Sequence, residues 1–171
     1  ESFNYAALMG LPVIFVCENN EYSVYTHLKS RQPDRPMNKI AEAHGWEVAT
    51  GNGNDLKQVA EISLQAVSRV RTNGCPQFLE FDTYRWIEHC GPNDDDHLDY
   101  RPPDQVASWK KKCPVKHMET QLLSDKIITQ KDLDSYRQSI MDEIELSFKF
   151  AQASPFPSPE SLHQFSNTAS S

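Results

Sequence analysis

The chain has 171 residues, of which 38% are hydrophobic and 24% charged, the composition of an ordinary globular domain. A chain of this length buries a sizeable core without structural metals or disulfides. The formal net charge of −7 argues against nucleic acid as the main partner. The longest apolar run, residues 11–17, is too short to cross a bilayer, so we expect no membrane partner.

The cysteines are far apart in the sequence, and no two have the Cys-x-x-Cys spacing of metal or redox motifs. They are Cys17, Cys75, Cys90 and Cys113. This pattern favours reduced thiols over a disulfide framework. We therefore expect a cytoplasmic protein, with the mitochondrial matrix as the alternative.

The first half of the chain alternates predicted helices and strands. Gly10 ends a first helix, and a buried strand follows it directly. The expected elements are helices over 2–9 and 38–44, strands over 11–17 and 46–49, a polar connection over 26–36 and a turn over 51–53.

A longer helix comes next, capped by Asp55, with Gln58 placed to complete a capping box. Gly74 and Pro76 end this helix, and residues 77–83 form the next strand. Strands that alternate with helices are joined by crossover connections, which make neighbouring strands parallel. The predicted fold class is α/β, with helices on both faces of a parallel sheet.

The pattern disappears over residues 85–103, which we interpret as a long active-site loop. Its acidic triplet, Asp94-Asp95-Asp96, is expected to be solvated, with ordering on ligand binding as the alternative. Helices are expected over 104–112 and 114–123, and Thr129 with Asp132 forms a capping box for a longer helix. The predicted organisation is an α/β domain over 1–103, a helical segment of the same domain over 104–153, and an extended tail over 154–171.

The first candidate site is Glu18-Asn19-Asn20, which directly follows the strand over 11–17. Polar ligands gather at the carboxyl ends of parallel strands. The amide oxygen of Asn20 and the backbone carbonyl of Tyr22 are hard oxygen ligands of the kind that Mg²⁺ prefers. The alternative is a simple Asx turn, which the two asparagines taken alone favour.

The second candidate site is Thr83-Tyr84-Arg85-Trp86-Ile87-Glu88-His89, where the chain leaves a core strand and enters the loop. A lone loop histidine is more often just solvated. However, we expect Arg85 and His89 to emerge at the same sheet edge as Asn20. Histidine is also the side chain best suited to proton transfer near neutral pH.

Two segments carry a resemblance to a known family. Asn4-x-Ala6-Ala7-Leu8 and the stretch from Leu11 to Tyr22 resemble the second half of the thiamine-diphosphate motif of 2-oxo acid dehydrogenase alpha subunits. That family comprises the E1 components of the pyruvate, acetoin and branched-chain dehydrogenases. The resemblance implies a thiamine-diphosphate-binding fold, and that this chain is the C-terminal half of a longer subunit. The Gly-Asp-Gly that begins the motif lies outside the chain.

The resemblance also implies roles for single residues. The side chain of Asn20 and the backbone carbonyl of Tyr22 match the ligands of a magnesium ion that bridges the cofactor's diphosphate. The Tyr-Arg-x-x-x-His spacing from Tyr84 to His89 matches the family's catalytic loop. It implies that His89 acts beside the reactive carbon of the thiazolium ring, and that Arg85 positions that loop within the catalytic machinery.

The implied activity is oxidative decarboxylation of a 2-oxo acid, with transfer of the acyl group to a lipoyl domain of an acyltransferase. The implied partner is a beta subunit, in a heterotetramer of two alpha and two beta subunits. Cys90 stands where animal relatives carry a regulatory serine. This departure leaves open a thiamine-diphosphate-dependent decarboxylase or carboligase that does not use lipoate. A non-catalytic docking subunit is the other alternative.

Overall fold

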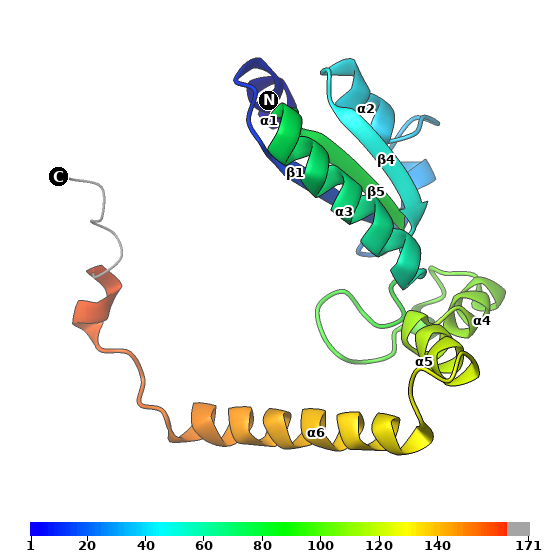
Figure 1. Cartoon of the computed structure of the whole chain (residues 1–171), viewed down its shortest axis with the longest axis vertical. Coiled ribbons are helices and arrows are strands. Elements are labelled where there is room, and N and C mark those ends of the chain that lie inside the picture. The colour runs from blue at the N-terminus through cyan, green and yellow to red at the C-terminus, as the bar shows by residue number, and fades with distance from the viewer. Residues whose placement is uncertain (164–171) are drawn as a thin grey trace. The chain divides into compact units, whose positions relative to one another are not determined.

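The computed structural model describes residues 1–163. The chain forms two compact units, one over Glu1–Gln121 and a second that begins at Leu122 (Figure 1). The predicted tail over 154–171 therefore lies partly outside the described residues. In the described part of this tail, residues Pro159–His163 form a short 3-10 helix.

The first unit is built on a parallel sheet with the strand order β1-β5-β4. The strands are β1 (Ile14–Asn19), β4 (Glu47–Asn52) and β5 (Gln77–Asp82). The central strand pairs with both neighbours in the same register, so Asp82 stands beside Asn19 on one side and Asn52 on the other. All three carboxyl ends therefore meet at one edge of the sheet.

Helices cover both faces of this sheet, as Figure 1 shows for α3. Phe78 packs with Ala6 of α1 (Ser2–Leu8) and Ala41 of α2 (Asn38–Ala43). Leu79, the next residue along β5, packs instead with Ala66 of α3 (Leu56–Asn73). Because successive side chains of a strand point to opposite faces, the two clusters lie on opposite sides of the sheet. The predicted fold class is confirmed.

Two local predictions around β4 and α3 are wrong. The strand continues through Asn52, and the turn begins only at Gly53, whose N–H donates to the Asp82 carbonyl at 2.8 Å. Asp55 caps α3 as expected, since its carboxylate accepts from the backbone N–H groups of Lys57 and Gln58. Gln58 does not complete a capping box, because its side-chain oxygen accepts from the Asn52 N–H instead.

The connection expected to be irregular over 26–36 contains part of a small hairpin. Its strands are β2 (Tyr22–Ser23) and β3 (Thr26–His27), which pair antiparallel. Val24 turns the chain between them with a positive φ of 54°, an uncommon conformation for a β-branched residue. A 3-10 helix over Leu28–Ser30 follows.

The helices after the long loop lie close to their predicted positions. They are α4 (Pro103–Lys111), α5 (Pro114–Ser124) and α6 (Gln130–Ala153), and the loop before them contains a 3-10 helix over Asp96–Leu98. The capping box of α6 is confirmed, with Thr129 and Asp132 each accepting from the other's backbone N–H. None of the helices within residues 1–163 is both long and apolar enough to cross a membrane.

Candidate functional site

The double asparagine at the end of β1 forms two consecutive Asx turns. The Asn20 side-chain oxygen accepts from the Tyr22 N–H at 2.9 Å, and that of Asn19 accepts from the Glu21 N–H at 3.1 Å. This is the turn geometry that the sequence left open as the alternative for Asn20. An amide oxygen has two lone pairs, so the Asn20 oxygen keeps one acceptor site beyond this hydrogen bond. Glu21 adopts a positive φ of 63° within the turn.

A buried carboxylate that the sequence analysis missed braces this turn. Glu80 of β5 is 8% exposed and accepts from the Asn19 side-chain NH₂ at 2.9 Å. Its other oxygen accepts from the backbone N–H of Asn38 at 3.1 Å. The neighbouring thiol of Cys17 has a raised pKa, mainly because of its burial and then because of the negative charges of Glu80 and Glu18. The sequence did contain one signal for this residue, because Glu80 is an acid within the otherwise apolar run Phe78–Phe81 of a central strand.

Tyr22 is held by a side chain from α4. Its hydroxyl donates to the side-chain oxygen of Gln105 at 3.2 Å, and the hydroxyl of Tyr84 donates to the same oxygen at 3.4 Å. The NH₂ group of Gln105 donates to Glu21 at 3.4 Å. Gln105 therefore connects the turn after β1 to the segment after β5, and no sequence signal distinguished it.

Aromatic rings fill the space around these hydrogen bonds. Tyr22 packs edge-on against Tyr100, with centroids 5.7 Å apart, and Tyr84 stacks on Trp109 at 5.4 Å. Burial raises the pKa of Tyr84 to about 12, although the positive charge of Arg101 acts in the opposite direction. The two candidate segments thus share an aromatic cluster whose hydroxyls stay protonated at neutral pH.

Arg85 makes the most direct connection between the two candidate segments. Its guanidinium donates to the backbone carbonyl of Val24 at 2.7 Å and to the hydroxyl of Tyr100 at 2.8 Å. Val24 follows the predicted metal ligands, and Tyr100 lies at the end of the long loop. Arg85 therefore connects the turn after β1 to the end of the long loop, and the positioning role that the resemblance implies for it stays a prediction.

The end of the loop is fixed by a buried ion pair. The side chains of Arg101 and Asp95 are each 2% exposed and contact each other directly. Arg101 also pairs with Asp96 at 2.8 Å and donates to the backbone carbonyl of Arg85. The expectation of a solvated acidic triplet is therefore wrong for Asp95, because the guanidinium of Arg101 draws its carboxylate into the interior.

His89 lies at the exposed tip of a small closed turn. The Glu88 side chain accepts from the backbone N–H of Asn93 at 3.1 Å, and the Glu88 N–H donates to the Asn93 carbonyl at 3.0 Å. These bonds close the base of the turn that presents His89 to solvent. No recorded contact in the described part of the chain joins His89 to Asn20 or Tyr22, so its place in a shared site stays a prediction.

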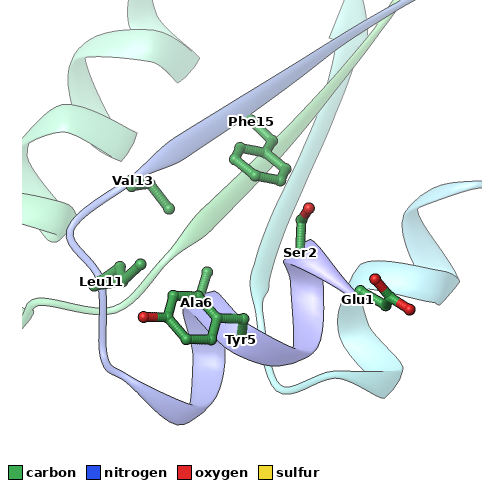
Figure 2. A pocket seen from close by; sticks show the side chains of 7 residues that line it. All are labelled: Glu1, Ser2, Tyr5, Ala6, Leu11, Val13 and Phe15. Carbon is green, nitrogen blue, oxygen red and sulfur yellow. The ribbon is translucent and has the colours of Figure 1, made fainter. Parts of the chain in front are cut away.

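An apolar hollow lies at the other end of β1 (Figure 2). It measures about 470 Å³, and Tyr5, Leu11, Val13 and Phe15 are among the residues that line it. Phe15 precedes Asn20 by five residues, which in an extended strand corresponds to roughly 17 Å. This hollow is therefore separate from the polar carboxyl edge.

The fold and the carboxyl edge of its sheet together define an α/β protein whose polar groups gather where the parallel strands end. This is the place where such folds bind charged ligands. The model of the family described as "Dehydrogenase E1 component" matches residues 1–160. The chain belongs to this family. The resemblance to this family is thereby confirmed.

Relatives of known name agree with this assignment. The chain is 32% identical over 163 residues to the "Pyruvate dehydrogenase E1 component subunit alpha" of Rickettsia bellii, covering 95% of this chain and 49% of the relative. It is 31% identical over 163 residues to the mitochondrial form of Dictyostelium discoideum, with 95% and 42% covered. The chloroplastic alpha-3 form of Oryza sativa is 30% identical over 158 residues, with 92% and 36% covered. The chain spans about half the length of the relatives or less, and which half it matches stays a prediction.

Proposed function

We propose that this chain is part of the alpha subunit of a thiamine-diphosphate-dependent 2-oxo acid dehydrogenase, which decarboxylates a 2-oxo acid and transfers the acyl group to a lipoyl domain. The main support is the hydrogen bond from Arg85 to the Val24 carbonyl, which connects the two motif segments across 61 residues. Family membership adds to this support. The proposed partner is a beta subunit, as the alpha-subunit names of the relatives suggest.

The residues present fit a magnesium ion and the diphosphate. Asn20 offers an uncharged amide oxygen with one lone pair uncommitted, and backbone carbonyls such as that of Tyr22 are also hard ligands. Within residues 1–163, no three His, Cys, Asp or Glu side chains form a cluster that could hold a metal. The remaining ligands of the ion would therefore come from groups outside residues 1–163. Asn20 and Tyr22 would hold the metal end of the cofactor.

Thiamine diphosphate, when bound, supplies the electron sink that allows a 2-oxo acid to lose carbon dioxide. The residues of this chain would bind and orient the cofactor. The turn after β1 is fixed by Glu80 and Gln105, so the Asn20 oxygen is held in place before a ligand arrives. His89 presents an imidazole that can donate or accept a proton. Arg85 secures the start of its loop.

The proposal is tested in the natural full-length protein assembled with its partner subunit. We expect His89→Ala to lower acyl transfer to a lipoyl domain by about 100-fold or more, which is the usual contribution of general acid–base catalysis. Affinity for thiamine diphosphate with Mg²⁺, measured by calorimetry, should change little. The matched control is His97→Ala, which removes an exposed histidine of the same loop and should leave both quantities unchanged.

The outcomes separate the alternatives. Equal loss of acyl transfer and of cofactor affinity in His89→Ala would contradict the catalytic role. Turnover that does not depend on a lipoyl domain would point to a decarboxylase or carboligase. If the wild-type protein binds no thiamine diphosphate, only the docking subunit remains. Asn20→Ala should weaken cofactor binding by at least about tenfold, as loss of groups around a metal usually does.

A further inference from the structure

A groove lined with basic side chains lies at the β4 edge of the sheet, away from Asn20, Tyr22, Arg85 and His89. Its volume is about 500 Å³, within the usual range for small-molecule sites. Lys111 and Lys112 line it from the end of α4, and Lys116 and His117 from the first turn of α5. This is a local reversal of charge in a chain whose net charge is −7.

The three lysines of the groove are not neutralised by acids. Within residues 1–163, none of them forms an ion pair, whereas their neighbour Lys110 pairs with Asp94 and Asp96 at 3.7 and 3.4 Å. Attraction to the negative end of α4 accounts for a lysine in its last turn. It does not account for Lys116, which belongs to the following helix.

Among the described residues, Asp55 contributes the only carboxylate that lines the groove, and this carboxylate is already engaged. Asp55 accepts from the backbone N–H groups of Lys57 and Gln58 and so caps α3. Neutral hydrogen-bonding groups complete the lining, with Asn54 tied to the wall by a bond of 2.9 Å from its NH₂ group to the Lys112 carbonyl.

We propose that this groove binds a small multivalent anion that carries phosphate groups. The ammonium groups of the lysines and the side-chain amides of the asparagines together form a donor set that suits phosphate oxygens. The concave shape favours a small molecule over an extended acidic partner. Asn52, at the end of β4, lines the groove. Because β5 lies between β4 and β1, Asn52 is two strand spacings, roughly 10 Å in total, from the end of β1 and the Asn20 turn. The inference does not rest on the proposed function.

The test is calorimetric titration of the natural full-length protein, in its assembly, with inorganic triphosphate as the probe. We expect saturable binding that persists when thiamine diphosphate and Mg²⁺ are saturating. The triple variant K111Q/K112Q/K116Q should weaken it by at least about tenfold, since each exposed charge contact contributes modestly. The variant K29Q/K131Q/K149Q removes the same charge elsewhere and should stay within about twofold of the wild type.

A second variant and a second probe complete the design. K111R/K112R/K116R keeps the charge and should bind within about threefold of the wild type. Orthophosphate should bind at least about tenfold more weakly than triphosphate, because it engages fewer lysines. The proposal is overturned by equal losses in the two glutamine triples, by competition with thiamine diphosphate, by equal affinity for the two phosphates, or by the absence of saturable binding.

Discussion

The buried ion pair between Arg101 and Asp95 yields the most quantitative prediction. Replacing Arg101 by Met keeps much of the side-chain volume but leaves the Asp95 carboxylate, 2% exposed, without its cation. Removing one partner of a buried pair costs about 3–5 kcal/mol. Asp95 keeps a hydrogen bond of 2.6 Å from the Tyr100 hydroxyl, so we expect a value near the lower limit, about 3 kcal/mol. We therefore expect Arg101→Met to lower the free energy that is needed to open the loop by this amount.

The asymmetry between the two partners makes the prediction specific. In Asp95→Asn, Arg101 retains Asp96 and the Arg85 carbonyl, so the cost should be only about 1–2 kcal/mol. The double variant should cost less than the sum of the two single variants, because residues in contact couple.

Hydrogen exchange measured by mass spectrometry over residues 86–100 reports the opening directly. In Arg101→Met, exchange there should accelerate by about a hundredfold, since each 1.4 kcal/mol corresponds to a factor of ten. Arg71→Met is the matched control, because this exposed arginine forms no ion pair within the described residues. It should change stability by less than about 0.5 kcal/mol. Acceleration below about fivefold in Arg101→Met, or a larger effect in Asp95→Asn, would refute the reasoning.

Two further predictions concern a glycine and a tyrosine. A Cβ at Gly53 would come within 2.8 Å of the Asp82 backbone carbonyl, so Gly53→Ala should lower the free energy of unfolding by about 2–3 kcal/mol, the upper part of the usual cost of overpacking. Gly45→Ala meets no atom within 4 Å and should cost only the roughly 1 kcal/mol of its positive φ, so equal denaturation midpoints would contradict the steric argument. The pKa of Tyr84 is raised to about 12, so the folded state binds that proton more tightly than the unfolded state. Its stabilising contribution is complete below pH about 10 and is lost as the pH rises toward 12. Ultraviolet titration should show one phenol near pH 12 that is missing in Tyr84→Phe, and identical titration curves would count against the burial of this hydroxyl.

The main features of the fold could be predicted from periodicity and from the order of elements. Local signals marked two strands, over 11–17 and 77–83, and the helix capped by Asp55. The bounds of the first strand were wrong, since it runs over Ile14–Asn19 and so includes the acid and the first asparagine that follow the apolar run. The alternation of these elements is sufficient for a parallel sheet, because a crossover helix makes successive strands run the same way. It follows that Asn19, Asn52 and Asp82 stand at one edge. Sequence reasoning could therefore predict which edge of the sheet carries the polar strand ends, while the functional role of those residues stays a prediction.

The missed features depend on contacts between residues far apart in the sequence. The hairpin of β2 and β3 has only two residues in each strand, too few for an alternating pattern to be visible. The Gln58 side chain bonds to Asn52 instead of completing a capping box, and this depends on where β4 ends. The sequence pattern likewise did not indicate that Arg101 would bury Asp95, since acidic triplets are usually solvated.

The orientation of Asn20 connects these observations to function. Taken alone, its bond to the Tyr22 N–H is the ordinary conformation of an asparagine in a turn. The surroundings of the turn are less ordinary, because a buried carboxylate, Glu80, holds the preceding asparagine, and Arg85 holds the Val24 carbonyl that follows. Positive φ angles at Glu21 and Val24 add strain, which persists only where the neighbouring structure enforces it. We expect a turn fixed from both sides in this way to hold the remaining lone pair of Asn20 in one direction, which is the property that a metal ligand requires.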